Sequence, residues 1–354
     1  MSIFNNKNLN TNIKNPCLDS FNMESFEYNL LKDLERDSFN ISLEFNRTVY
    51  TGLKSDNLEI VNEGFTDFFK EAAKFFKELA MKIIEFTKNY MKYFISYFQD
   101  FKKFLEKNKE YLRSLDINFE YKGYNFDFSK DSPDLTKIHD IVSSYNSEIS
   151  RVDSLTYAEV GKMRETFANE ENKNKIRASI LNNGEHEVSQ EKFKEKSKEL
   201  FRKNSEPVQL NINNSYIDMI INEYGNMKSL LEETERNKNK ITKLLHDLEY
   251  FFDKKASVTY DKHQKIIKTS KLDTSDNKFK HGDSVSMNYD NDVLKTLNVY
   301  FDLKYRESKF ISNCVVTVYI DKVNALKDCL SQYRNIVRRA LVNNKKSSES
   351  EGKK

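Results

Sequence analysis

The sequence predicts a mainly α protein, an elongated molecule with long amphipathic helices and one small β-hairpin. Glycine and proline, which interrupt helices, account for only 8 and 3 of the 354 residues. Apolar residues recur every three or four positions over long stretches, which is the period of one helix face. Charged residues make up 32% and apolar residues 38% of the chain. This composition disfavours a turn-rich sandwich, a barrel or a glycine-rich phosphate-binding enzyme.

An acidic leader over residues 1–63 is the first predicted unit. It holds six basic and ten acidic residues, whereas the whole chain carries a net charge of +3, so the remainder is mildly basic. Residues 1–20 are expected to be disordered, and a short helix is expected over 21–34. The leader lacks the apolar core of a signal peptide. No apolar run reaches the roughly 20 residues that span a bilayer.

A long amphipathic helix is predicted over residues 62–108, in a second unit that spans residues 64–130. Steps of three and four residues join its apolar side chains, most of them aromatic, into one face. A second face is also largely aromatic, so the helix needs partners on two sides or a break into two packed helices. The first face is the predicted assembly face, made of Phe65, Phe68, Phe69, Phe76, Leu79, Ile83, Phe86, Tyr90, Phe94 and Phe101. It is expected to bury against the C-terminal helix or against other copies of the chain.

The apolar period changes from about 3.6 to 2 after this helix. Apolar and polar residues alternate over 117–121 and again over 124–128, on either side of Lys122-Gly123, which predicts a β-hairpin. A helical body is predicted over 131–342 and a disordered tail over 343–354. Within the body, helices are expected over 135–150, 214–252 and 305–342, a linker or a short extended piece over 207–214 and a polar loop over 268–290.

No motif predicts catalysis, a cofactor or a metal ion. The five histidines have no partner histidine three or four residues away, so no helical pair of metal ligands forms. The strained serine turn of hydrolases and the glycine-rich phosphate loop are both absent. The three cysteines, at 17, 314 and 329, are expected to be reduced. We therefore expect a non-enzymatic protein without a small-molecule substrate, and a catalytic protein with a divergent site is the remaining alternative.

Two further interpretations depend on charge. A basic group near the C-terminus is explained by the helix dipole, with weak nucleic-acid contact as the alternative. Its members are Arg334, Arg338, Arg339, Lys345 and Lys346. The aromatic helix could instead lie on a membrane. Acidic residues are mixed with lysine along its polar strip and tryptophan is absent, so core packing or helix assembly is favoured and a membrane-associated amphipathic protein is the alternative.

Three stretches carry a family resemblance: NEGFTDFFK at residues 62–70, FFK at 75–77 and FKKFLEKNK at 101–109. They resemble internal virion or prohead-core proteins of large tailed bacteriophages, in which a leader and a Glu-Gly-Phe junction precede an aromatic, lysine-rich helix. The resemblance implies a structural protein of the capsid interior that is present in the host cytoplasm during assembly. Its implied partners are other copies of itself or other virion proteins, with weak contact to packaged DNA.

The same resemblance implies proteolytic maturation between Glu63 and Gly64. In many such phages a protease cuts after Glu when an aliphatic residue, most often Leu or Ile, stands two positions before it, and Val61 stands there in this chain. Removal of the acidic leader would leave a more basic body beside DNA. The junction is expected to lie in a polar segment before the long helix, where a protease can reach the backbone. If the leader is retained, its short helix is expected to pack on the body.

Overall fold

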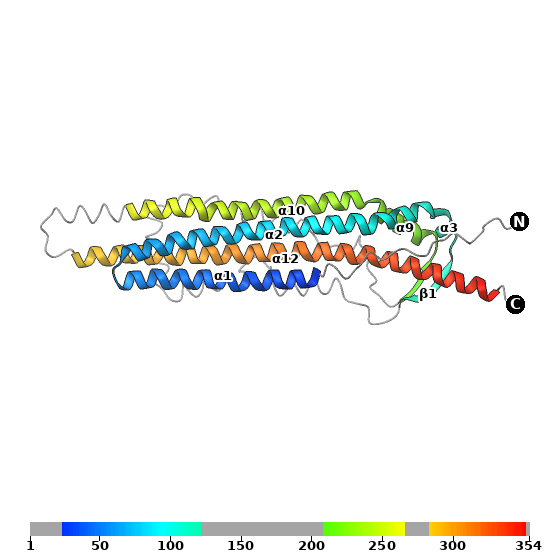
Figure 1. Ribbon diagram of the computed structural model, residues 1–354, viewed down its shortest axis with the longest axis horizontal. Coiled ribbons are helices and arrows are strands. Elements are labelled where there is room, and N and C mark those ends of the chain that lie inside the picture. The colour runs from blue at the N-terminus through cyan, green and yellow to red at the C-terminus, as the bar shows by residue number, and fades with distance from the viewer. Residues whose placement is uncertain (1–22, 122–207, 266–282, 352–354) are drawn as a thin grey trace.

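The described part of the chain forms a long bundle of four main helices that run alternately up and down (Figure 1). The structure is a computed structural model, and it describes residues 23–121, 208–265 and 283–351. The predicted mainly helical, elongated fold with a small β element is confirmed. The elements in chain order are α1 (Met23–Lys54), α2 (Leu58–Lys107), α3 (Lys109–Arg113), β1 (Ile117–Tyr121), β2 (Val208–Ile212), α9 (Asn214–Gly225), α10 (Met227–Tyr250), the π-helical turn η4 (Phe251–Ala256) and α12 (Asp283–Glu351).

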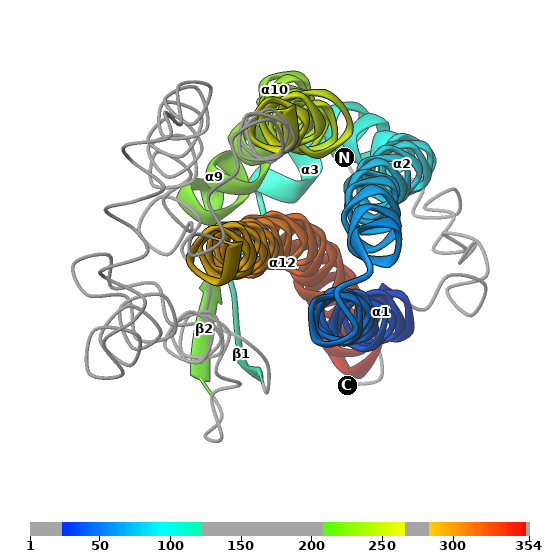
Figure 2. The same cartoon turned by 90° about the vertical axis from the view of Figure 1, so that its left-hand side faces the viewer.

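Helix α2 contacts each of the other three main helices. It packs most extensively against its sequence neighbour α1 and against α10. At one end of the bundle the Phe68 ring lies against the rings of Phe252 and Tyr305. At the other end the Phe101 ring lies against Tyr224 and below the Arg334 guanidinium. α2 therefore runs antiparallel to α10 and parallel to α12, which gives an up-down-up-down bundle. Figure 2 shows the four helices end-on, with α2 between α1 and α10.

A short turn and two glycines bring α1 against α2. The Asn57 side chain accepts hydrogen bonds from the backbone N–H groups of Glu59 and Ile60, so α2 begins at Leu58 rather than near residue 62 as expected. A Cβ atom on Gly52 would lie 2.7 Å from the Val61 Cγ2 atom. A Cβ atom on Gly64 would lie 3.1 Å from the side chains of both Thr48 and Val49. Both glycines thus permit the close approach of the two helices.

The β element differs from the predicted hairpin in its second strand. The first strand, β1, forms as expected, but it pairs antiparallel with β2, with Phe119 opposite Leu210. The predicted second strand, 124–128, lies outside the described residues. The β2 segment was expected to be a linker or a short extended piece. Its Val208, Leu210 and Ile212 alternate with polar residues, and this spacing matches that of β1.

Several helix ends also differ from expectation. α1 continues some twenty residues beyond the short helix expected over 21–34. α12 begins at Asp283, within the expected loop, and runs to Glu351, within the expected disordered tail. The predicted helix over 214–252 is present as α9 and α10 with a break at Asn226. The helix expected over 135–150 lies outside the described residues. No helix in the described part is long and apolar enough to cross a membrane.

Candidate interaction surfaces

The predicted assembly face of α2 lies inside the bundle. None of its ten side chains, from Phe65 to Phe101, is more than 3% exposed. The Phe45 ring of α1 stacks on Phe68 at 3.9 Å between centroids, and the Tyr260 ring stacks on Phe65 at 4.1 Å. The chain itself therefore covers this face. Of the two expected modes of burial, against other helices of the same chain or against other copies, the structure has the first.

This burial bears on two interpretations of the aromatic face, contact with another chain and contact with a membrane, and both stay predictions. An exposed face of that size would have required another chain, but α1, α10 and α12 already fill it with their own rings. A membrane would need the same face turned outward, and in this fold it is core. The second face of the helix is divided: Phe75 and Phe98 are buried, whereas Ile84 is 41% exposed.

The Glu63–Gly64 bond lies within the second turn of α2, not in a polar segment before it. Glu63 is exposed, but Gly64 is buried against α1. A protease binds its substrate in an extended conformation, so a cut at this bond requires the first turns of α2 to unwind and α1 to separate. The structure gives Gly64 a packing role that the sequence pattern alone did not reveal. Cleavage itself stays a prediction.

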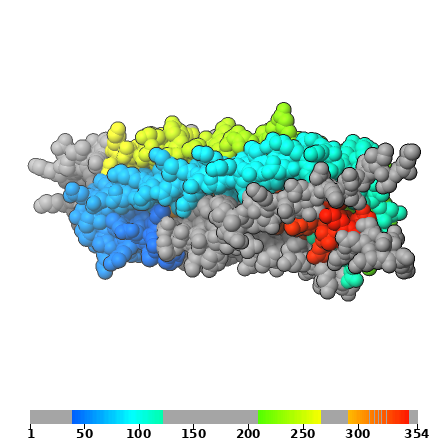
Figure 3. All heavy atoms as spheres, turned by 45° about the vertical axis from the view of Figure 1, so that its right-hand side comes forward, coloured from blue at the N-terminus to red at the C-terminus, as the bar shows by residue number. Residues whose placement is uncertain are grey.

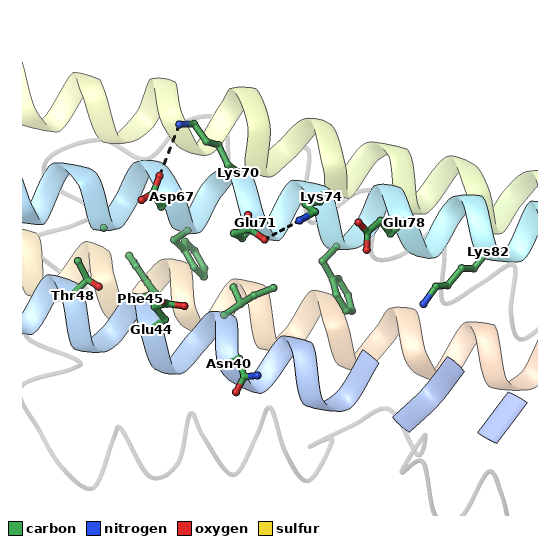
Figure 4. A pocket seen from close by; sticks show the side chains of 14 residues that line it. Asn40, Glu44, Phe45, Thr48, Asp67, Lys70, Glu71, Lys74, Glu78 and Lys82 are labelled. Carbon is green, nitrogen blue, oxygen red and sulfur yellow. Dashed lines mark ion pairs between the residues drawn. The ribbon is translucent and has the colours of Figure 1, made fainter. Parts of the chain in front are cut away.

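An open groove runs between α1 and α2 (Figure 4). Its volume is about 650 Å³, and Ile41, Phe45, Phe68 and Phe75 provide its apolar side chains. Charged residues of α2 line its rim, and two ion pairs form there, Lys70 with Asp67 at 3.9 Å and Lys74 with Glu71 at 3.7 Å. These pairs are more than half exposed, so they contribute little to stability. Alternating charges over an apolar floor suit contact with another protein surface better than a small-molecule site.

The outer side of α1 carries a row of three exposed apolar side chains and the half-buried Asn46, here called the α1 outer stripe. Its members are Phe39, Leu43, Asn46 and Tyr50. The three apolar members are 66%, 56% and 69% exposed, respectively. Their spacing of four, three and four residues places them on one face of the helix. Sequence reasoning missed this stripe because the leader helix was expected to end near residue 34, although the spacing itself was visible.

Helix α2 carries a second such row, the α2 outer stripe. Its members are Met81, Ile84, Lys88, Met91 and Ile95. Met81, Ile84 and Ile95 are 52%, 41% and 45% exposed, whereas Met91 is half-buried and packs against the core. Figure 3 shows α2 open along this side of the molecule, between α10 and α1. The spacing is again three and four residues, so these side chains form a continuous seam.

The basic group near the C-terminus is divided by the structure. Arg334 is 5% exposed, and its guanidinium lies 4.4 Å from the centre of the Tyr97 ring. It is therefore a core residue, which corrects its place in the expected basic group. Arg338 and Arg339 are exposed and border a cavity of about 580 Å³ between β1 and α12. Arg339 also lies over the Tyr121 ring at 5.1 Å.

Two histidines of the described residues contact local partners. The His246 Nδ1 atom is 3.0 Å from a Glu249 carboxylate oxygen, and His263 contacts the Thr259 carbonyl oxygen through Nδ1 at 2.8 Å. Cys329 is a buried thiol. Within the described ranges, no group of His, Cys, Asp and Glu side chains is placed to hold a metal ion. The other three histidines, at 139, 186 and 281, lie outside those ranges.

Comparison with protein-family models, with curated proteins and with solved structures found no match to this chain.

Proposed function

We propose that this chain is a non-enzymatic structural protein of a tailed-bacteriophage particle, internal to the head, which acts by helix-mediated assembly. The family resemblance of residues 62–70, 75–77 and 101–109 supports the assignment of the chain to a phage particle. One structural observation carries the assembly role: the aromatic core is complete within one chain, while apolar stripes remain on the outer sides of α1 and α2. A rod with its own core can fold first and then associate through its outer surface.

The surface proposed for assembly is the outside of the bundle, not the aromatic side of α2 that the sequence predicted. The aromatic side of α2 holds the bundle together, so it serves stability rather than association. The outer stripes and the groove between α1 and α2 are the surfaces left for other copies or other virion proteins. Contact with packaged DNA is assigned to Arg338, Arg339 and Lys345, which are exposed near the end of α12. Such contact is weak because only a few positive charges take part.

Mass spectrometry of purified particles of the phage that encodes the chain tests this function. We expect the chain at many copies per particle, protected from added protease until the capsid is opened. Absence of the chain from purified particles, or its loss on protease treatment of intact particles, would overturn an internal structural role. The same experiment reads the N-terminus: Gly64 supports maturation, and full recovery of peptides from residues 20–54 shows that α1 is retained.

A further inference from the structure

We propose that the α1 outer stripe of one copy docks antiparallel on the α2 outer stripe of a second copy. The contact joins two different surfaces of the chain, so it can repeat from copy to copy. This inference rests on the proposed function, for which it names the two contact surfaces. The partner is a second copy because each stripe supplies what the other requires, in apolar spacing and in charge.

The apolar spacing of the two stripes matches in one antiparallel register. Both stripes advance by alternating steps of three and four residues, as facing positions of paired helices do. The register places Phe39 opposite Ile95, Leu43 opposite Met91, Asn46 opposite Lys88 and Tyr50 opposite Ile84. The two polar members therefore meet each other in a single layer, each apolar member of the α1 outer stripe meets an apolar one, and Met81 lies beyond the paired layers.

The charges beside the two stripes are complementary in the same register. Arg47 and Lys54 flank the α1 outer stripe, seven residues apart, whereas Glu78 and Glu85 flank the α2 outer stripe, also seven residues apart. Seven residues correspond to roughly 10 Å along a helix. Both pairs lie on the same rotational side of their stripe, and antiparallel packing brings those sides together. All four side chains are exposed.

These four charges are available for a partner. Within the described residues, none of them takes part in a salt bridge of the chain itself, unlike their neighbours Lys70 and Lys74. The register places Arg47 near Glu85 of the second copy and Lys54 near Glu78. Each rim pair alone contributes little, but together they favour this antiparallel orientation.

The exposed Lys92 lies on the same side of the α2 outer stripe as Glu78 and Glu85, seven residues beyond Glu85, and in the proposed register it lies near Asn40 of the second copy. A pairing of two α2 outer stripes with Glu85 near Lys92 is therefore the competing outcome of the test. Association that Arg47→Glu leaves unchanged would favour it, because that pairing does not involve Arg47.

The docking has a defined consequence for the assembly. Within one chain, Phe45 stacks on Phe68. Because α1 and α2 are antiparallel, Leu43 lies at the same height along the bundle as Lys70 of α2. In the proposed contact Leu43 faces Met91, which is roughly 30 Å further along α2. Neighbouring copies therefore point the same way and are staggered by that distance. A contact between unlike surfaces gives a ring or an open array instead of a closed dimer.

A disulfide experiment on the full chain tests this register. Phe39→Cys and Ile95→Cys are both exposed positions on well-packed helices, and within one chain they are too far apart to cross-link. Under mild oxidation we expect the double variant to give a ladder of dimers, trimers and larger species. The wild-type chain and each single variant serve as controls. Absence of the ladder, or dimers from Phe39→Cys alone at the same yield, would overturn the proposed register.

Charge exchange tests the partner. We expect Arg47→Glu and Glu85→Arg each to weaken self-association in sedimentation velocity by roughly tenfold, and the double variant to restore it. Lys240→Glu, an exposed change on α10, is the control, and circular dichroism verifies that each variant is folded. Wild-type association in all variants would refute the contact. The contact would also be refuted if the chain binds anionic vesicles, Arg47→Glu abolishes that binding, and the same variant sediments like the wild type.

The two proposals fail separately. If the chain is found inside particles but forms no ladder, only the register is overturned. If the ladder forms but purified particles lack the chain, the contact stands and the phage role is overturned.

Discussion

The hydroxyl groups of Thr87 and Tyr319 share a hydrogen bond of 2.8 Å in the buried core, where α2 meets α12. The Thr87 hydroxyl donates its single hydrogen to the Ile83 carbonyl oxygen at 2.9 Å, so Tyr319 is the donor to Thr87. The Thr234 carbonyl oxygen of α10 lies 3.5 Å from the same Tyr319 hydroxyl. One tyrosine thus joins three helices, and the polar contact fixes their relative positions along the bundle.

We expect Thr87→Val to lower the free energy of unfolding by about 1–3 kcal/mol. The change leaves the Tyr319 hydroxyl buried with only a long contact to Thr234. Tyr319→Phe should cost less, about 1 kcal/mol, because the Thr87 hydroxyl keeps its bond to Ile83. Urea unfolding of both single variants and the double variant measures the coupling. Strictly additive effects would show that the hydrogen bond makes no contribution.

The two interface glycines should respond differently to alanine. Gly52→Ala is expected to destabilise the chain by about 1–3 kcal/mol, because the new methyl group would meet the Val61 backbone nitrogen at 2.9 Å. Gly64→Ala is expected to be milder. Its neighbours are side chains at 3.1 Å, and alanine adds about 1 kcal/mol of helix propensity.

Gly225→Ala is the matched control for both glycines, since no atom lies within 4 Å of its added methyl group. Thermal unfolding gives the order of stability, and proteolysis with a glutamate-specific enzyme reports on access to Glu63. Faster cutting after Glu63 in Gly52→Ala than in the wild type is expected, because the separation of α1 exposes that bond. Equal stability of all three variants would contradict the close-packing role.

Stability should fall in alkaline solution above about pH 10. Burial raises the pKa of Tyr90 and Tyr224 well above 10.0, and burial likewise raises the pKa of Tyr319. Burial also raises the pKa of Tyr216, to about 12. Below pH 10 these groups are neutral in both states. As pH rises past 10 the unfolded chain loses its phenolic protons first, so the folded state loses about 1.4 kcal/mol per pH unit for each such tyrosine.

Tyrosinate absorbance followed together with circular dichroism measures this effect. We expect a fraction of the tyrosines to ionise only when the helical signal is lost, in one cooperative step. Smooth ionisation of all tyrosines, with the helical signal intact, would contradict the burial of these rings. Tyr90→Phe is a useful comparison because it removes one buried phenol and should make the alkaline loss shallower.

Arg334 is expected to act on stability rather than on nucleic acid. Replacing it with lysine removes the planar contact with Tyr97 and Phe101, which we expect to cost roughly 1–2 kcal/mol. Retention of DNA on the folded variant should be unchanged. The paired change Arg338→Gln with Arg339→Gln should have little effect on unfolding but lower any DNA retention. Lower DNA retention with unchanged stability in the Arg334 variant would instead show that Arg334 belongs to the DNA-contacting surface.

Local sequence pattern predicted the long helix α2 and most of the side chains that it buries. The 3.6-residue period from Phe65 to Phe101 is a local property of the chain, so it predicted both the long helix and the residues that turn away from water. The alternation at Ile117, Phe119 and Tyr121 likewise predicted β1. Charge and composition also disfavoured a glycine-rich enzyme before any fold was known.

What covers each face depends on the packing of the whole chain. An apolar face must be buried, but its period does not say whether the same chain or another one buries it, and here Phe45, Tyr260 and Tyr319 do so. The pairing of β1 with β2 joins segments far apart in sequence, so local alternation could not identify the partner. Gly64 resembled a cleavage junction in sequence and is a close helix contact in space, because backbone proximity is set by packing between helices.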